Sequence, residues 1–155
     1  MIWETLTLEF ANEHDLPTPM RQLAQQVTKA TFDATNITGT VTLQICTDEE
    51  MRQLNHKFRH VNKGTDVLSF PTRSTIIADA PKLLGDVAIS YHRSVCQGHS
   101  FGHGIHREFA YLLTHAILHL GGHTHDGIPN FKMMRELEEE ILTSIGLGRG
   151  QAPTA

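Results

Sequence analysis

The chain has few cysteines and no long apolar run. Its two cysteines, Cys46 and Cys96, lie far apart and form no Cys-x-x-Cys pair, so we expect reduced, structural thiols rather than a disulfide framework. No apolar stretch approaches the ~20 residues that a membrane helix needs. The N-terminus, Met1-Ile2-Trp3-Glu4, lacks the basic and apolar segments of a secretory signal. These absences predict a cytoplasmic protein with no membrane partner.

The length and composition predict one compact domain. The 155 residues are 39% hydrophobic and 19% charged, which is ordinary for a protein with a packed core. We expect a single domain over residues 1–148 and a disordered tail over residues 149–155.

Apolar periodicity predicts the order of helices and strands. Strands are expected at 5–10, 39–46, 66–70 and 86–91, a loop at 76–83, and helices at 17–31, 48–60, 92–98, 105–120 and 131–145. Thr47 and Glu50 fit a capping box for the second helix, whose Met51, Leu54 and Phe58 are expected to face inward. This order predicts an α+β fold, with helices packed on a small mixed β-sheet.

The charge is unevenly distributed along the chain. The formal net charge is −4, which taken alone argues against nucleic-acid binding, and no DNA partner is expected. Residues 52–107, however, contain eight Lys and Arg against three acidic residues, while the remainder is strongly acidic. A basic middle segment is compatible with a phosphate-binding face.

Histidine is the unusual residue of this sequence. Seven of the eleven histidines lie between residues 99 and 125. His115 and His119 are four apart and share one helix face, and Gly121-Gly122 allows a turn that brings back His125. Three imidazoles leave a fourth tetrahedral position for water, which is typical of catalytic zinc. We therefore predict one Zn²⁺ per chain, bound by His115, His119 and His125.

The surrounding helix supports this prediction. It is apolar nearly all round, so both histidines need polar partners, and one metal ion satisfies both. Two histidines four apart are also common as structural residues, and His123 is an alternative ligand to His125. The spacing also occurs in metzincin proteases, but these need a glutamate after the first histidine, and Ala116 stands there.

The segment resembles the signature of the YbeY family of bacterial endoribonucleases, His-Gly-x-Leu-His-Leu-x-Gly-Tyr-Asp-His. Here it reads His115-Ala-Ile-Leu-His-Leu-Gly-Gly-His-Thr-His125, with Ala116, His123 and Thr124 departing from the pattern. Similar blocks occur upstream and downstream in the family's order: Leu54-Asn55-x-x-Phe58-Arg59, Thr65 to Pro71, Leu84 to Ser90, Arg107-Glu108, and Met134 to Leu147.

The resemblance implies a zincin-like fold and cleavage of single-stranded RNA. It further implies a role in ribosomal RNA 3′-end maturation and ribosome quality control, with the small ribosomal subunit as partner. Arg59 matches the family's functional arginine, and its planar guanidinium suits phosphate. The family pattern has an aspartate at the position of Thr124, where an acid can orient a ligand histidine, and the neighbouring Asp126 is a partial substitute for it.

The other charged residues are interpreted more simply. Four further basic residues could extend a cationic track beside Arg59, but an ordinary solvated position is the simpler interpretation of each: Lys57, His60, Lys63 and Arg73. The acidic run formed by Glu136 and residues 138–140 is expected on the exposed face of the last helix. Two further functions stay open: a metal-dependent hydrolase of peptide, amide or another phosphoester bond, and a non-catalytic, zinc-stabilised ribosome-assembly factor.

Overall fold

A four-stranded mixed sheet lies at the centre of the fold. The computed structural model describes residues 5–12, 16–72, 83–102, 104–123 and 126–149. Its elements are β1 (Leu6–Phe10), α1 (Thr18–Thr35), β2 (Gly39–Cys46), α2 (Asp48–Arg59), β3 (Val67–Pro71), β4 (Leu83–Ser90), α3 (Tyr91–Ser100), α4 (Gly104–Leu120) and α5 (Ile128–Ser144). The strand order is β1-β2-β4-β3, with only β3 antiparallel to its neighbour. The predicted α+β fold is confirmed.

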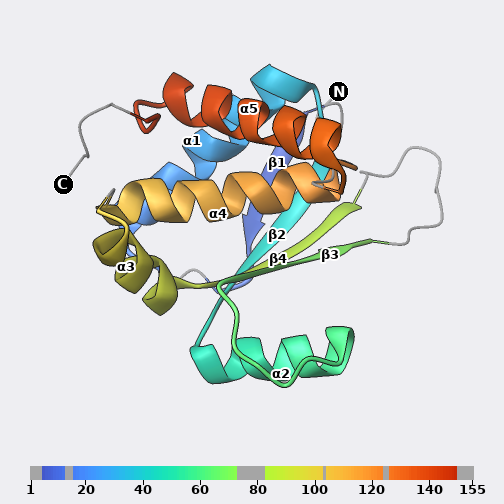
Figure 1. Cartoon of the computed structure of the whole chain (residues 1–155), viewed down its shortest axis with the longest axis vertical. Coiled ribbons are helices and arrows are strands. Elements are labelled where there is room, and N and C mark those ends of the chain that lie inside the picture. The colour runs from blue at the N-terminus through green and yellow to red at the C-terminus, as the bar shows by residue number, and fades with distance from the viewer. Residues whose placement is uncertain (1–4, 13–15, 73–82, 103, 124–125, 150–155) are drawn as a thin grey trace.

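The helices lie unequally on the two faces of the sheet. α1, α4 and α5 are stacked on one face, which we call the inner face, and α2 lies alone on the other, the outer face (Figure 1). Val41 and Leu43 of β2 both face the inner side, and both are fully buried against α1 and α4. This larger core supports α4, the helix predicted to carry the metal.

The outer face is only partly covered. The predicted capping box of α2 is present, because the Thr47 hydroxyl accepts from the Glu50 amide and the Glu50 carboxylate accepts from the Thr47 amide. Met51 is fully buried in a small cluster with Cys46, Leu68 and Ala88. Asp86, two residues before Ala88 on the same face of β4, is exposed instead. α2 therefore covers one end of this face and leaves the other open.

The expectation for Phe58 is wrong. This side chain was expected to face inward with Met51 and Leu54, but it is 54% exposed. Phe58 lies in the last turn of α2, away from the cluster around Met51, and its ring packs only against the ring of Phe70 among the described aromatic residues.

Several boundaries differ from expectation by a few residues. α5 begins at Ile128 rather than at 131, because Pro129 occupies the first turn, where its missing N–H and fixed φ are tolerated. β4 begins at Leu83; the rest of the loop expected at 76–83 lies outside the described residues, as do residues 150–155. The domain limits therefore stay predictions. Within the described ranges, no helix has the length and apolar character of a membrane span.

Gly85 sets the distance between the sheet and the end of α4. Its φ is +155°, and a Cβ at this position would lie 2.5 Å from the Phe70 carbonyl oxygen and 2.7 Å from Cδ2 of Leu120. The carbonyl belongs to the paired edge strand and cannot yield easily. The absence of a side chain at Gly85 thus lets β3, β4 and the C-terminal turn of α4 meet.

We predict that Gly85→Ala lowers the free energy of unfolding by about 1–3 kcal/mol, because β3 and α4 must move apart. Chemical denaturation monitored by circular dichroism measures the change. Gly102→Ala is the matched control: Gly102 also has a positive φ, +74°, but an added Cβ there would meet nothing within 4 Å. Equal losses in the two variants would contradict the proposed close approach.

Candidate metal centre and catalytic site

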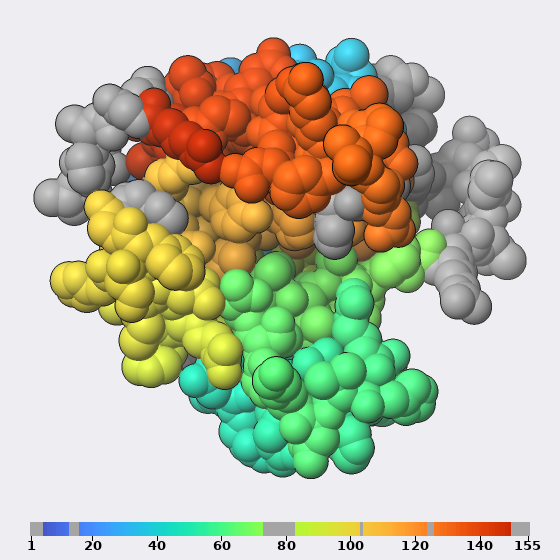
Figure 2. Space-filling view, in the orientation of Figure 1, coloured from blue at the N-terminus to red at the C-terminus, as the bar shows by residue number. Residues whose placement is uncertain are grey.

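The histidines of α4 lie on the one stripe of this helix that reaches the surface. From Glu108 to Leu120 every residue is buried except Tyr111, His115 and His119, which are spaced four apart and half-buried. Figure 2 shows α4 at the surface between α5 and the chain segment that follows α2. The apolar composition that buries this helix thus leaves its two histidines on the same partly exposed stripe.

The two imidazoles are close and differently oriented. The ring centroids of His115 and His119 are 4.7 Å apart, and the planes are inclined by 72°. Neutral imidazole nitrogens are ordinary ligands of Zn²⁺. The four-residue spacing therefore places two imidazole rings side by side, as the sequence predicted.

Glu138 of α5 forms a hydrogen bond with His115. Its Oε2 lies 2.5 Å from Nδ1 of His115, and the residue is only 5% exposed. A carboxylate at Nδ1 accepts the proton of that nitrogen and makes Nε2 the unprotonated nitrogen of the ring. This arrangement fits a metal ligand, because the ring is held in one tautomer and one orientation. The interpretation of Glu138 as part of an exposed acidic face is wrong.

A second contact, made by the neighbour of Glu138 and by Leu147, ties the end of α5 to α4. Arg107, near the start of α4, donates to the carbonyl oxygen of Leu147 at 2.5 Å and to the Glu139 carboxylate at 3.3 Å. Desolvation raises the pKa of the Glu139 carboxyl, but the hydrogen bond from the Arg149 backbone and the charge of Arg107 outweigh it, so that the pKa lies below its usual value.

Tyr111 lies one turn before His115 on the same partly exposed stripe of α4. Its ring centroid lies 5.7 Å from that of His115, with the planes inclined by 34°. Burial raises the pKa of the Tyr111 phenol, and the charge of Glu138 raises it further, against an opposing effect of Arg135. The phenol is therefore a neutral group at physiological pH and can donate a hydrogen bond.

The chain turns sharply after His119. His123 N–H donates to the Leu118 carbonyl at 2.9 Å, and Gly122 N–H donates to the His119 carbonyl at 3.0 Å, which is the pattern of a Schellman ending. Gly122 has a φ of +97°, as this ending requires. The expected diglycine turn is present. The third predicted ligand, His125, and Thr124 lie outside the described residues, so the three-histidine site stays a prediction.

No group of three His, Cys, Asp or Glu side chains placed to hold a metal ion occurs in the described part of the chain. That part contains only two of the three predicted ligands. What it does show is a pair of adjacent imidazoles, one of them oriented by a buried carboxylate.

Arg59 reaches the edge strand from the outer face. Its Nη2 donates to the Ser69 carbonyl of β3 at 3.3 Å, and the residue is exposed. β3 packs against α4, and the next carbonyl along β3, that of Phe70, lies by Gly85 next to Leu120. The structure thus places the Arg59 side chain against β3, the strand that packs on α4. A guanidinium has five N–H donors, so this one bond leaves others for a ligand.

The structure does not decide the interpretation of the other basic residues. Lys57, His60 and Lys63 are exposed around the end of α2, as both interpretations of the cationic track allow, and Arg73 lies outside the described residues.

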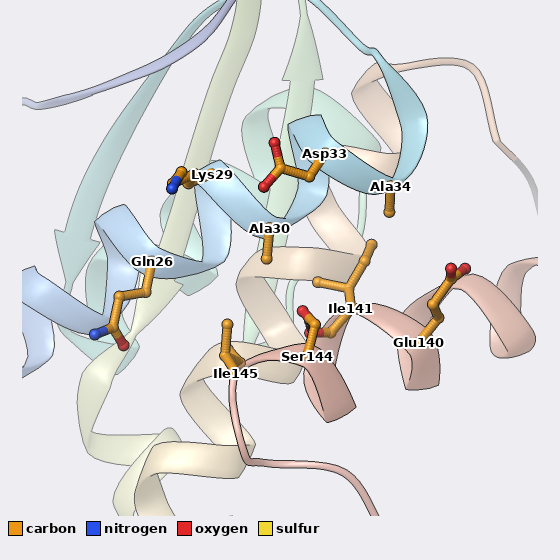
Figure 3. Close-up of a pocket in the computed structure, with 9 residues that line it drawn as sticks. All are labelled: Gln26, Lys29, Ala30, Asp33, Ala34, Glu140, Ile141, Ser144 and Ile145. Carbon is orange, nitrogen blue, oxygen red and sulfur yellow. Dashed lines mark hydrogen bonds between the residues drawn. The ribbon is translucent and has the colours of Figure 1, made fainter.

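A separate groove of about 530 Å³ lies between α1 and α5. Figure 3 shows Ala30, Ala34 and Ile141 at its centre, and none of its described lining residues is a histidine.

The comparisons with known proteins agree with this layout. The family model described as "Endoribonuclease YbeY" matches residues 8–146. A protein named Endoribonuclease YbeY from Chloroflexus aurantiacus is 45% identical over 115 residues, which cover 70% of this chain and 75% of its own. Its namesake from Chloroflexus aggregans is 37% identical over 153 residues, with coverages of 94% and 99%.

A solved structure shows the same fold. The solution structure of TM1509 from Thermotoga maritima matches with a TM-score of 0.57 and 18% identity, and the match covers 91% of each chain. At this identity the likeness concerns the fold alone. The family match spans every predicted site residue, from Arg59 to His125, and it covers most of the chain. On this evidence, together with its identity to the curated relatives, the chain belongs to the YbeY family.

Proposed function

We propose that this protein is a zinc-dependent, single-strand-specific endoribonuclease that acts in ribosomal RNA 3′-end maturation and ribosome quality control. Its relatives are named as endoribonucleases, which supports cleavage of RNA. The basic segment at residues 52–107 supports a polyanionic substrate. Ribosomal RNA, the small ribosomal subunit and a cytoplasmic location belong to the proposal.

The observation that carries the metal centre is the His115–Glu138 pair. A buried carboxylate that fixes the Nδ1 proton of a histidine is the usual support of a metal-bound imidazole. His119 adds a second nitrogen at 4.7 Å between ring centroids, and His125 is proposed as the third. When bound, zinc supplies Lewis acidity toward a phosphoryl oxygen and makes water a stronger acid.

The chain's own residues perform the other tasks. Arg59 binds a phosphate oxygen and offsets the negative charge that develops on phosphorus during hydrolysis. Glu138 holds the Nδ1 proton of His115 and keeps Nε2 available. Tyr111 presents a neutral phenol beside His115 and limits the access of water to that side of the ring.

We predict that His115→Ala abolishes cleavage of a single-stranded ribosomal RNA fragment and lowers zinc content well below one ion per chain. The physical reason is the loss of the imidazole that Glu138 orients. Metal analysis of protein purified without an affinity tag, followed by gel assay with and without chelator, measures both. The same RNA in a duplex should stay intact.

The alternatives give different results in that experiment. Unchanged cleavage by His115→Ala would eliminate the catalytic assignment. Zinc-loaded wild-type protein that cuts no RNA but sediments with small ribosomal subunits would favour an assembly factor. Hydrolysis of peptide or amide substrates in place of RNA would indicate the other hydrolase class.

For Glu138→Ala we expect zinc affinity to fall by roughly 10- to 100-fold, because His115 loses the acceptor that fixes its tautomer. Glu138→Gln should lose less, since its amide oxygen still accepts from Nδ1. Competition with a chromophoric chelator measures the dissociation constants without an activity assay. Glu136→Gln, an exposed change on the same helix, is the control and should bind zinc normally. Equal affinity in all three variants would contradict the role of Glu138.

For Arg59→Ala and Arg59→Glu we expect full zinc content with cleavage reduced by roughly 100-fold or more, because a preorganised cation is lost. Single-turnover kinetics at saturating RNA separates this effect from weaker binding. Arg52→Ala is the matched control, since Arg52 is a partly exposed arginine of the same helix whose charge is already paired with Glu49. Intact turnover in Arg59→Ala would show that its charge is only a surface feature.

A further inference from the structure

The open end of the outer face contains a cavity of about 730 Å³ between α2 and the sheet. Phe58 and Arg59 line it from α2, and Phe70 lines it from β3. Gln44 and Asp86 contribute from the central strands. We call these five residues the outer-face platform. The platform lies on the opposite side of β3 from the inner face that α4 covers.

Two aromatic rings form one wall of the platform. Phe58 is 54% exposed, and its ring centroid lies 5.1 Å from that of Phe70 with an interplanar angle of 57°. The Nζ of Lys57 lies 5.2 Å from the Phe58 centroid. An exposed aromatic ring with a cation beside it suits a planar ligand that is attached to an anion, since the ring stacks and the cation binds the charge.

The charges around the platform are separated by sign. Asp48 and Glu49, at the start of α2, are paired with Arg93 and Arg52. At the other end of α2, neither Lys57 nor Arg59 forms an ion pair with any acid in the described ranges. These two cations are therefore available to phosphates.

The floor of the platform is polar and acidic. Asp86 is exposed and pairs in register with Phe70 on one side and Thr42 on the other, while Gln44 lies beside Ala88. A carboxylate repels phosphate but accepts hydrogen bonds from the amino groups of bases, as a glutamine side chain also can. The floor and the ring wall therefore suit a nucleic-acid base, and Arg59 suits a phosphate.

We propose that the outer-face platform binds an unpaired base of the RNA, with the base stacked on Phe58 and its phosphate on Arg59. This inference rests on the proposed function. Arg59 lines the platform and contacts Ser69 of β3, the strand that packs against α4, so the stacked base belongs to the nucleotide whose phosphate Arg59 binds. A base in a duplex has both its faces and its edge occupied, so the platform selects for single strands.

The test measures binding of a fluorescein-labelled single-stranded oligoribonucleotide by fluorescence anisotropy, in the non-cleaving His115→Ala protein. We expect Phe58→Leu to bind roughly 5- to 100-fold more weakly, because an aliphatic side chain preserves apolar contact with Phe70 but cannot stack on a base. Phe58→Tyr and Phe58→Trp should bind as tightly as the parent. Phe101→Ala is the control, since Phe101 is 63% exposed and lies at the end of α3.

A second readout locates the base directly. The fluorescence of Phe58→Trp should be quenched when RNA is added, beyond any change seen in the parent, whose one tryptophan is Trp3. Thermal unfolding of Phe58→Leu should match that of the parent, because the side chain is more than half exposed. Equal RNA affinity of Phe58→Leu and the parent would overturn the proposal and leave the cavity to a protein partner.

The two proposals fail in different ways. Cleavage that requires His115 but is indifferent to Phe58 would remove the platform and keep the nuclease. Weaker RNA binding by Phe58→Leu, in a protein whose wild-type form cuts no RNA, would keep the platform and remove the nuclease.

Discussion

The burial of α4 is the constraint on which the site depends. Glu108 to Leu120 is covered on every side except one, and the stripe left open contains Tyr111, His115 and His119. Because the helix packs against α1, β3, β4 and α5, it cannot rotate without exposing its apolar residues. The hydrophobic core therefore fixes the direction of the two imidazoles, and the hydrogen bond that His115 donates to Glu138 fixes the proton on one of them.

Much of this arrangement could be predicted from the sequence, because the patterns involved are local. The apolar residues of α4 predicted its burial, its two histidines four apart predicted a shared face, and Thr47 with Glu50 predicted the start of α2. The apolar periodicity of residues 39–46 predicted the strand β2. The resemblance predicted the fold, and the family match agrees with it. Apart from the resemblance, each of these signals lies within one element, so no tertiary contact had to be known.

The two errors concern side chains whose surroundings are set by distant elements. Glu138 was assigned to an exposed acidic run, although its spacing from Met134 and Ile141 puts it on the buried face of α5. That signal was present and was outweighed by the charge of its neighbours. Phe58 has the spacing of a core residue, but α2 extends past the cluster it covers, and nothing within the helix reveals where the sheet ends.

The edge strand β3 connects these observations. Its inner side borders α4, its outer side carries Phe70, and its backbone accepts the hydrogen bond from Arg59. The open edge of a sheet is usually protected from other strands, and here α4 and the side chains of α2 lie beside it. An unpaired RNA strand cannot extend the sheet as another β-strand would, and a cation with an aromatic ring suits its phosphates and bases. The last turn of α2 provides both at adjacent positions, and this is why we place the entry of the substrate there.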